Sequence, residues 1–378
     1  MTATASRAGG EVAAEPRPYF VNAWVDGFFL GGFSIFFFVY LRFGVVFLDQ
    51  DSGAETATFL GQSAARWAVL AFWVLNWPHF AATSYRLYRS KETVSQYPVT
   101  AFGVPIIVGI GAVLALMNPA TVAPWFVKLF FIWSPYHFSG QTIGLTILYA
   151  RRAGFTVTPL LRWSLTWFVF ATCADVQARA ELPGTTITFG DVVIPSIGIP
   201  TWVSDVTNWA VIALGMVLVL AVVDATQRSA GRFPVILVIP ALAQLTWFKL
   251  AVGTWETRSY IEFVNLFHSI QYLFIAWFMQ MKERQIITGE EGSRSRLVKE
   301  TALWGLLIFL IGAFMFRGSA RLISSISPVA FGVSLAVMTA AFQLHHFFVD
   351  GVIWKLRNPR IRGALNTSLG ELMGGRGR

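Results

Sequence analysis

The sequence is poor in two classes of residue: Cys173 is its only cysteine, and charged residues make up 13% of its 378 residues. A single cysteine excludes a disulfide within the chain, a cysteine-ligated zinc site and an iron–sulfur cluster held by this chain alone. Any metal that the chain binds must therefore be held by nitrogen and oxygen atoms. Low charge combined with 55% hydrophobic residues excludes an ordinary soluble domain. We expect an all-α, polytopic transmembrane helix bundle in the lipid bilayer.

The N-terminal region and the basic residues predict where the chain ends lie. The first 20 residues contain no apolar core followed by a cleavage site, so we expect no removable signal peptide. A net charge of +9 would suggest nucleic-acid binding in a soluble protein, but the positive-inside rule explains the excess, and we predict no nucleic-acid partner. Lys and Arg are concentrated in alternate connections, which predicts a plasma (inner) membrane protein with both termini in the cytoplasm.

Apolar segments of roughly 18 to 28 residues recur along the chain, and each is long enough to cross about 30 Å of hydrocarbon. Ten such spans are predicted, at residues 25–47, 65–87, 99–118, 123–149, 159–177, 206–225, 233–252, 259–281, 300–316 and 327–354. An even number of spans agrees with both termini lying on one side of the membrane.

The spans form one predicted domain, residues 25–356, between a polar N-terminal tail at 1–24 and a basic C-terminal tail at 357–378. Residues 178–203 contain LPGTTITFGDVVIPSIGIPTW, which is rich in β-branched residues, glycine and proline and predicts an outward-facing hairpin or loop. Residues 283–299 carry many charges and predict a solvated cytoplasmic linker.

Every histidine falls inside a predicted span rather than in a loop. The five are His79, His137, His268, His345 and His346. Their predicted spans all run from the outside toward the cytoplasm. A rise of 1.5 Å per residue places the histidines about 10 to 21 Å from the first basic residue at the cytoplasmic end of each span. Modest helix tilts would bring them into one layer, so we predict a single histidine-lined site. Hydrogen bonding between helices is an alternative role, but it gives no reason for histidine at all five positions.

Each histidine has a polar companion at helical spacing, which is typical of groups that orient a metal-bound imidazole. The predicted orienting amides are Asn76, Gln141, Asn265 and Gln271. Asp350 lies four residues after His346 and shares its helix face, whereas His345 points about 100° away from His346. Tyr272 follows His268 at the same spacing. We predict Asp350 and Tyr272 as catalytic side chains.

The donor types narrow the chemistry of the predicted site. Histidine and carboxylate without thiolate suit iron, copper or zinc, and three or four imidazoles with an open position suit an Fe(II) ion that activates dioxygen. Five histidines are too few for the eight or so of membrane desaturases and alkane hydroxylases, whose H-x-x-H-H boxes are missing. A haem-binding b-type electron carrier or quinol oxidoreductase is an alternative. A proton-coupled transporter that uses the histidines and Asp350 as a relay is another.

One stretch also carries a family resemblance. In YIEFVNLFHSIQYLFI, around His268, an aromatic-rich approach leads to His-Ser and a polar residue two positions further on. This resembles the corresponding motif of the Brp/Blh family of membrane-embedded β-carotene dioxygenases, and NWPHFAATSY is similar to another His-Phe motif of that family. The resemblance implies central cleavage of a long polyene at one iron. It also implies the iron ligands, which would be His79, His137, His268 and one of His345 or His346.

The chain departs from that family in two places. The second histidine after His-Ser is replaced by Gln271 or Tyr272, and the early His-Gly motif is absent from the first span. The 34 phenylalanines and 15 tryptophans suit a slot for a hydrophobic small molecule, although such rings also fill bundle cores and form interfacial belts. We therefore predict a non-haem iron oxygenase that acts on a carotenoid or another lipophilic substrate, as a monomer or an oligomer.

Overall fold

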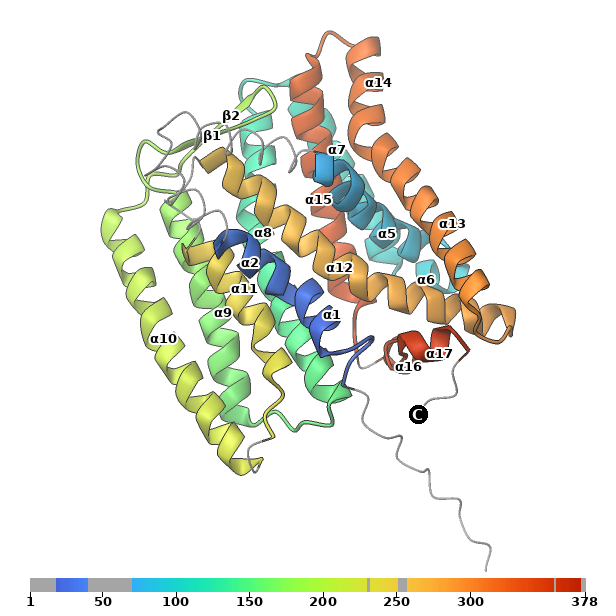
Figure 1. Ribbon diagram of the computed structural model, residues 1–378. Helices are drawn as coiled ribbons and strands as arrows, with labels where there is room; N and C mark the ends of the chain where they lie inside the picture. Colours follow the sequence, from blue (N-terminus) through green and yellow to red (C-terminus); the bar gives the residue numbers. More distant parts are fainter. Residues whose placement is uncertain (1–17, 40–69, 230–231, 251–256, 357, 375–378) are drawn as a thin grey trace, which may run out of the picture.

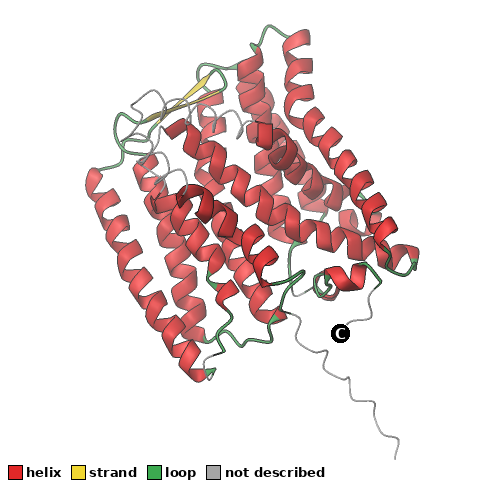
Figure 2. Ribbon diagram, in the orientation of Figure 1, coloured by secondary structure: helices red, strands yellow, loops and turns green. Residues whose placement is uncertain are grey.

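The computed structural model describes residues 18–39, 70–229, 232–250, 257–356 and 358–374. These residues form a mostly helical bundle with one small β-hairpin (Figures 1 and 2). The hairpin lies at one end of the bundle, and the short C-terminal helices lie at the other (Figure 1).

The helices divide at the hairpin into two sets. Before the hairpin come α1 (Ala23–Gly27), η1 (Phe28–Gly32), α2 (Phe33–Val39), η3 (Phe72–Asn76), α5 (Trp77–Tyr88), α6 (Lys91–Gln96), η4 (Val99–Gly103), α7 (Val104–Met117), α8 (Ala123–Arg152) and α9 (Pro159–Ala180). After it come α10 (Thr201–Arg228), η5 (Val235–Leu237), α11 (Ile239–Leu245), η6 (Thr246–Leu250), α12 (Thr257–Thr288), α13 (Arg294–Ala313), η7 (Phe314–Gly318), α14 (Ser319–Ile326), α15 (Phe331–Ile353), α16 (Pro359–Ala364) and α17 (Leu369–Leu372). The η elements are wide π-helical turns, except η5, which is a 3₁₀ turn.

Four helical stretches of the described chain are long and apolar enough to cross a membrane. They are Val99–Met117, Thr201–Arg228, Arg294–Ile326 and Phe331–Ile353. Each coincides with a predicted span, and together they indicate a membrane protein. The count of ten spans stays a prediction, because parts of the first two lie outside the described residues.

Helix α15 is the most buried of these four stretches. Buried residues make up 67% of its apolar window, compared with 33% or less in the other three stretches. It contacts α5, α7, α8 and α14. Ala336 and Ala340 on α15 are fully buried, and such small side chains allow neighbouring helices to approach closely. Side chains of α15 can therefore meet side chains from several other helices.

A proline interrupts helical hydrogen bonding just before His79. Pro78 is the second residue of α5, and α5 directly follows the π-helical turn η3. Because proline has no N–H, the carbonyl four residues earlier loses its usual helical partner, and a wider turn can absorb the change. The helical hydrogen bonding is therefore irregular just before His79.

A second proline, Pro135, lies inside α8 two residues before His137. The carbonyl of Phe131, four residues before Pro135, accepts a hydrogen bond instead from Nε2 of Gln177 on α9, at 3.2 Å. The same amide donates to the carbonyl of Ile132 at 2.7 Å. A neighbouring helix therefore supplies a hydrogen bond to the carbonyl that the proline leaves without its helical partner.

The hairpin consists of β1 (Thr186–Phe189) and β2 (Val192–Pro195), which pair in antiparallel register from Thr186 opposite Pro195 to Phe189 opposite Val192. It occupies the centre of the segment 178–203, for which a hairpin was predicted, while α9 and α10 take up the two ends. Lys128 of α8 contacts the base of the hairpin. It forms an ion pair at 2.7 Å with Glu181, which precedes the hairpin, and donates a hydrogen bond to the carbonyl of Pro195, the last residue of β2.

Helices extend into two segments that were predicted as a solvated linker and a basic C-terminal tail. α12 continues to Thr288 and α13 begins at Arg294, so only residues 289–293 of the predicted linker 283–299 lie between helices. The predicted tail at 357–378 contains α16 and α17, in which Ile361 and Leu372 are buried. In the C-terminal segment, apolar residues are spaced among the basic ones and give the helices a face that packs on the bundle.

The two ends of the described chain meet at the end of the bundle where α16 and α17 lie. The Leu369 amide donates to the Phe20 carbonyl at 2.8 Å. Arg152, at the end of α8, donates to the carbonyls of Tyr19 and Thr367 at 2.7 and 2.9 Å. These contacts hold the N-terminal and C-terminal segments side by side.

Candidate metal centre

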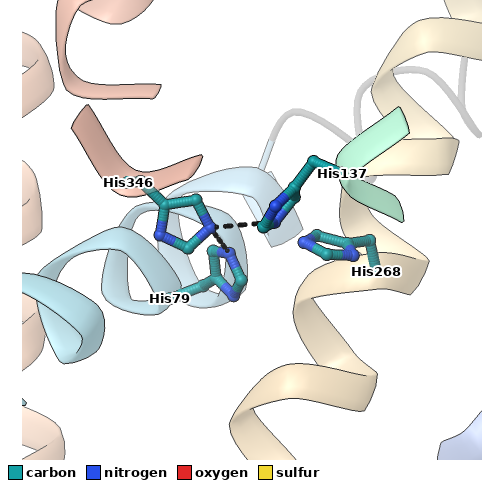
Figure 3. Close-up of side chains that lie close together, drawn as sticks. All are labelled: His79, His137, His268 and His346. Atoms are coloured by element: carbon teal, nitrogen blue, oxygen red, sulfur yellow. Dashed lines mark hydrogen bonds between the residues drawn. The ribbon is translucent and has the colours of Figure 1, made fainter. Parts of the chain in front are cut away.

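Four of the five histidines come together inside the bundle, each from a different helix (Figure 3). The four are His79 of α5, His137 of α8, His268 of α12 and His346 of α15. One ligand atom from each lies within 4.8 Å of those from the others. This cluster of four histidines is the candidate metal centre.

The nitrogens of three histidines lie especially close together. Nε2 of His346 lies 2.9 Å from Nε2 of His79 and 3.2 Å from Nε2 of His137 (Figure 3). The ring of His268 closes the group, with its centroid 4.9 Å from that of His79 and 5.0 Å from that of His137. The four imidazoles therefore surround one small volume.

Burial separates this cluster from solvent. His79, His268 and His346 are at most 2% exposed, and the side chain of His137 is 9% exposed. Within the described chain, Nδ1 of His79 and His346 and both ring nitrogens of His268 have no hydrogen-bond partner. Buried polar atoms are normally hydrogen-bonded, and an ion held by one nitrogen of each ring would give His268 one of the partners that it lacks. Neutral imidazole nitrogen is a favoured ligand of transition metals, and this donor set fits such an ion.

Asp350 lies on the side of the cluster formed by His346 and His137. Its Oδ2 atom is 3.3 Å from Nε2 of His346 and 3.7 Å from Nε2 of His137. Its other oxygen, Oδ1, accepts hydrogen bonds from Thr83 at 3.1 Å and from the Trp354 indole at 3.2 Å. The predicted catalytic carboxylate is therefore next to the cluster and held in one orientation.

Tyr272, the other predicted catalytic residue, also lies beside the cluster. Its ring centroid is 4.1 Å from that of His79, and its hydroxyl is 2.5 Å from the hydroxyl of Thr83. Since Thr83 donates to Asp350, the hydroxyl of Tyr272 is the donor to Thr83. Tyr272, Thr83 and Asp350 thus form a hydrogen-bonded chain along the edge of the cluster.

His345 does not belong to the four. Its Nε2 atom lies 3.2 Å from the hydroxyl of Tyr88, which itself donates to the Ala101 carbonyl at 2.8 Å. His345 and His346 point in different directions, as their spacing on one helix requires. The sequence left open which of the two joins the site, and the structure places His346 there.

The predicted orienting amides mostly bind other groups. Asn76 accepts a hydrogen bond from Ser269 at 2.8 Å. Gln141 donates to the backbone carbonyl of His268 at 3.1 Å and to Gln271 at 2.9 Å, and Gln271 donates to the Leu30 carbonyl at 2.6 Å. Oγ of Ser269 donates to the backbone carbonyl of Asn265. The described bonds of Asn76, Gln141 and Gln271 join helices and do not hold imidazole nitrogens, because amides in a bundle can bridge to any neighbouring helix.

Sequence reasoning missed Thr83 and Trp354. Thr83 is fully buried four residues after His79, and Trp354 follows Asp350 at the same spacing. The spacing that singled out Asp350 and Tyr272 would have found both, because residues four apart share a helix face. Threonine and tryptophan were overlooked because they are ordinary residues in an apolar helix.

A cavity of about 380 Å³ opens beside the centre. His137, Tyr272 and Asp350 line it on the side of the cluster. Its other walls are mainly aromatic and aliphatic, and they include Trp133, Tyr136, Leu145, Leu148, Phe170, Ile275, Phe347, Trp354, Leu356 and Leu365. An apolar ligand could lie in this cavity with one part against the centre.

No protein-family model matches the chain, and no curated protein or solved structure shows significant similarity to it. The chemistry of the centre therefore has to be inferred from its own geometry.

Proposed function

We propose that this chain is a multi-pass membrane protein in which the four-histidine cluster binds one transition-metal ion. The observation that carries the proposal is the convergence of four buried imidazoles from four helices, with ligand atoms within 4.8 Å of one another. Unpaired polar groups are costly in apolar surroundings, and a shared cation would use the nitrogen lone pairs.

The nitrogen spacing supports a single ion. Ligand nitrogens about 2.1 Å from one ion lie about 3.0 Å apart at a right angle and about 3.4 Å apart at the tetrahedral angle. The separations of 2.9 and 3.2 Å around His346 are close to this range. Hydrogen bonds between the rings have a similar length, but a single ion would in addition bind one of the two His268 ring nitrogens that have no partner within the described chain.

The same spacing disfavours haem. A bis-histidine haem needs a flat macrocycle between its two axial imidazoles. Nitrogens 2.9 Å apart on His79 and His346 leave no room for one, and the other two rings occupy the flanks. A small ion fits the cluster better than a macrocycle does.

For the reaction, we propose a non-haem Fe(II) oxygenase that acts on a carotenoid or another lipophilic substrate. The bound ion would supply the activation of dioxygen. The apolar cavity supports a lipophilic substrate, and burial of the cluster would keep water from the reacting groups. Asp350 and Tyr272 line the cavity next to the cluster, so they would contact the part of the substrate that reacts. The choice of iron and of a polyene also draws on the resemblance to the Brp/Blh family.

For the topology, we propose ten spans with both termini on the cytoplasmic side of the plasma membrane. The contact between Phe20 and Leu369 supports placing both ends on one side. The concentration of Lys and Arg in alternate connections supports the cytoplasmic side.

Metal analysis of detergent-purified protein tests the central proposal. We expect about one iron per chain, without a Soret band, and loss of the iron in His268→Ala and in His346→Ala. His345→Ala is the matched control, because this neighbouring buried histidine lies outside the cluster. Absence of metal from anaerobically prepared wild type, or equal loss in the control, would contradict the proposal.

Incubation with carotenoids tests the reaction separately. Iron-loaded protein should convert a carotenoid to cleavage products only when oxygen is present, and Asp350→Asn should reduce the rate. Iron binding without oxygen-dependent turnover of any polyene would leave the metal site in place and remove the proposed substrate class.

The hydrogen-bonded chain of Tyr272, Thr83 and Asp350 favours one alternative, a proton-coupled transporter in which these groups and the histidines relay protons. That function predicts flux driven by a pH gradient in proteoliposomes and no bound metal. The metal analysis therefore distinguishes the two functions directly.

A further inference from the structure

Asp350 faces the same imidazole nitrogens that would hold the ion. We propose that its carboxylate is a fifth ligand, so that the centre is a four-histidine, one-carboxylate site. This inference depends on the proposed metal site and goes beyond it by assigning Asp350 to the coordination sphere of the ion, in addition to its place beside the substrate cavity.

The first argument is directional. A carboxylate that only orients a metal-bound imidazole accepts a hydrogen bond from the ring nitrogen opposite the metal. Asp350 does not lie there: its Oδ2 atom approaches Nε2 of both His346 and His137, and these two atoms face each other at 3.2 Å. Asp350 therefore lies on the inner side of the rings, where the ion would be.

The second argument is the spacing of the oxygen. Ligand atoms about 2.1 Å from an ion lie about 3.0 Å apart at a right angle and about 3.6 Å apart at 120°. The separations of 3.3 and 3.7 Å from Oδ2 to the two nitrogens are near these values. One carboxylate oxygen can thus share an ion with His346 and His137 after only a small adjustment.

The third argument is charge. A divalent ion held by four neutral imidazoles would carry two uncompensated positive charges in a buried site, which is costly. Within the described chain, Asp350 is the only acidic side chain within ion-pairing distance of a histidine in the cluster. Asp350 in turn is 8% exposed and has no Lys or Arg within that distance among the described residues. The carboxylate and the ion would each supply the charge that the other needs.

The hydrogen bonds around Asp350 leave one of its two carboxylate oxygens available to bind an ion. Thr83 and the Trp354 indole both donate to Oδ1, at 3.1 and 3.2 Å. Oδ2 is thereby turned toward the histidines as a monodentate ligand. Five protein ligands leave one position open on a six-coordinate ion. The cavity lined by His137, Tyr272 and Asp350 provides a route to that position.

The test uses Co(II) as the probe with purified full-length protein. Asp350→Asn preserves shape but removes the charged ligand, and we expect at least about a 100-fold loss of Co(II) affinity together with a changed visible absorption band. Asp350→Glu should restore much of the affinity. Asp175→Asn is the control, because Asp175 is a fully buried carboxylate that pairs with Arg179 and Lys249 instead of histidine, and it should keep the wild-type affinity and band.

Several outcomes would overturn the assignment. Wild-type affinity and spectrum in Asp350→Asn would remove Asp350 from the site while leaving the four-histidine proposal standing. Weaker binding with an unchanged band would make it a positioning residue only. Failure of wild type to bind Co(II) at all would overturn the metal site and this inference together.

A measurement on wild type alone covers the case in which Asp350→Asn does not fold. The infrared difference spectrum between Co(II)-loaded and metal-free protein should show a shift of a carboxylate stretching band that moves on ¹³C-aspartate labelling. Absence of a labelled carboxylate band from that difference spectrum would contradict ligation by Asp350.

Discussion

Among the groups of polar side chains buried in the described part of this bundle, one lies around Asp175 and another around His346. Asp175 is fully buried and forms ion pairs with Arg179 at 2.6 Å and Lys249 at 3.1 Å. Lys249 also donates to Asn208, and Arg179 to the Phe248 carbonyl. In this group each charge has an opposite charge or a hydrogen-bond partner within the protein.

The group around His346 differs in that its polar atoms face one another without completing their hydrogen bonds. Four histidine rings meet, several of their nitrogens have no hydrogen-bond partner within the described chain, and no described Lys or Arg lies within ion-pairing distance of Asp350. Polar groups in an apolar bundle thus differ in whether their charges and hydrogen bonds are complete. A complete group needs no ligand, whereas a convergent group with unpaired atoms is a candidate ligand site.

The largest expected effect is the dependence of stability on metal at the histidine cluster. Chelation should lower the free energy of unfolding of wild type by about 4 kcal/mol if the ion had been present at about 1,000 times its Kd. The same treatment should leave His346→Ala unchanged, because that variant has lost the site. Thermal unfolding in detergent with and without chelator measures both. An equal loss of stability in wild type and His346→Ala on chelation would contradict the proposal that the histidine cluster binds the metal.

A substitution in the group around Asp175 should lower the stability of the protein without changing its metal content. Asp175→Ala would leave Arg179 and Lys249 without their shared partner and should cost about 3 kcal/mol of stability. Metal content per chain should stay at the wild-type value, because Asp175 takes no part in the cluster. Thermal unfolding and metal analysis of the same preparation check the two halves of this prediction. Loss of metal without loss of stability would reverse the roles assigned here.

A smaller effect is expected from the amide that repairs the proline break in α8. Gln177→Leu removes the donor to the carbonyls of Phe131 and Ile132 and should cost about 1 to 2 kcal/mol. Gln96→Leu, at an exposed position, is the control and should be nearly neutral. Equal stability of the two variants would mean that the Gln177 bonds contribute nothing.

The smallest effect should come from the histidine outside the cluster. His345→Ala removes the contact with the Tyr88 hydroxyl and should cost about 1 kcal/mol, with no change in metal affinity. A Co(II) titration beside His346→Ala gives the sharpest comparison, since the two positions are adjacent in sequence. A weakened Co(II) affinity in His345→Ala would show that both histidines contribute to the site.

Much of the candidate site was predictable because histidine and aspartate are rare in apolar helices. The sequence predicted that His79, His137 and His268 lie within apolar spans, and a helix rise of 1.5 Å per residue predicted comparable depths for them. Asp350 could be placed on the face of His346 by its spacing of four residues. The amides were harder to interpret, because Asn76 and Gln141 share a helix with a histidine and yet bind groups on α12.

The sequence by itself determined that the chain is apolar enough for a membrane and that its candidate ligand atoms are nitrogen and oxygen, because composition and spacing are local properties of the chain. It also established that His345 and His346 cannot both point the same way. Which of them joins the cluster depends on how α15 is rotated about its axis, and that rotation is set by its contacts with α5, α7, α8 and α14. The same packing brings Thr83 and Trp354 to one oxygen of Asp350 and leaves the other facing the histidines. Such relations between separate helices arise only when the whole bundle is packed.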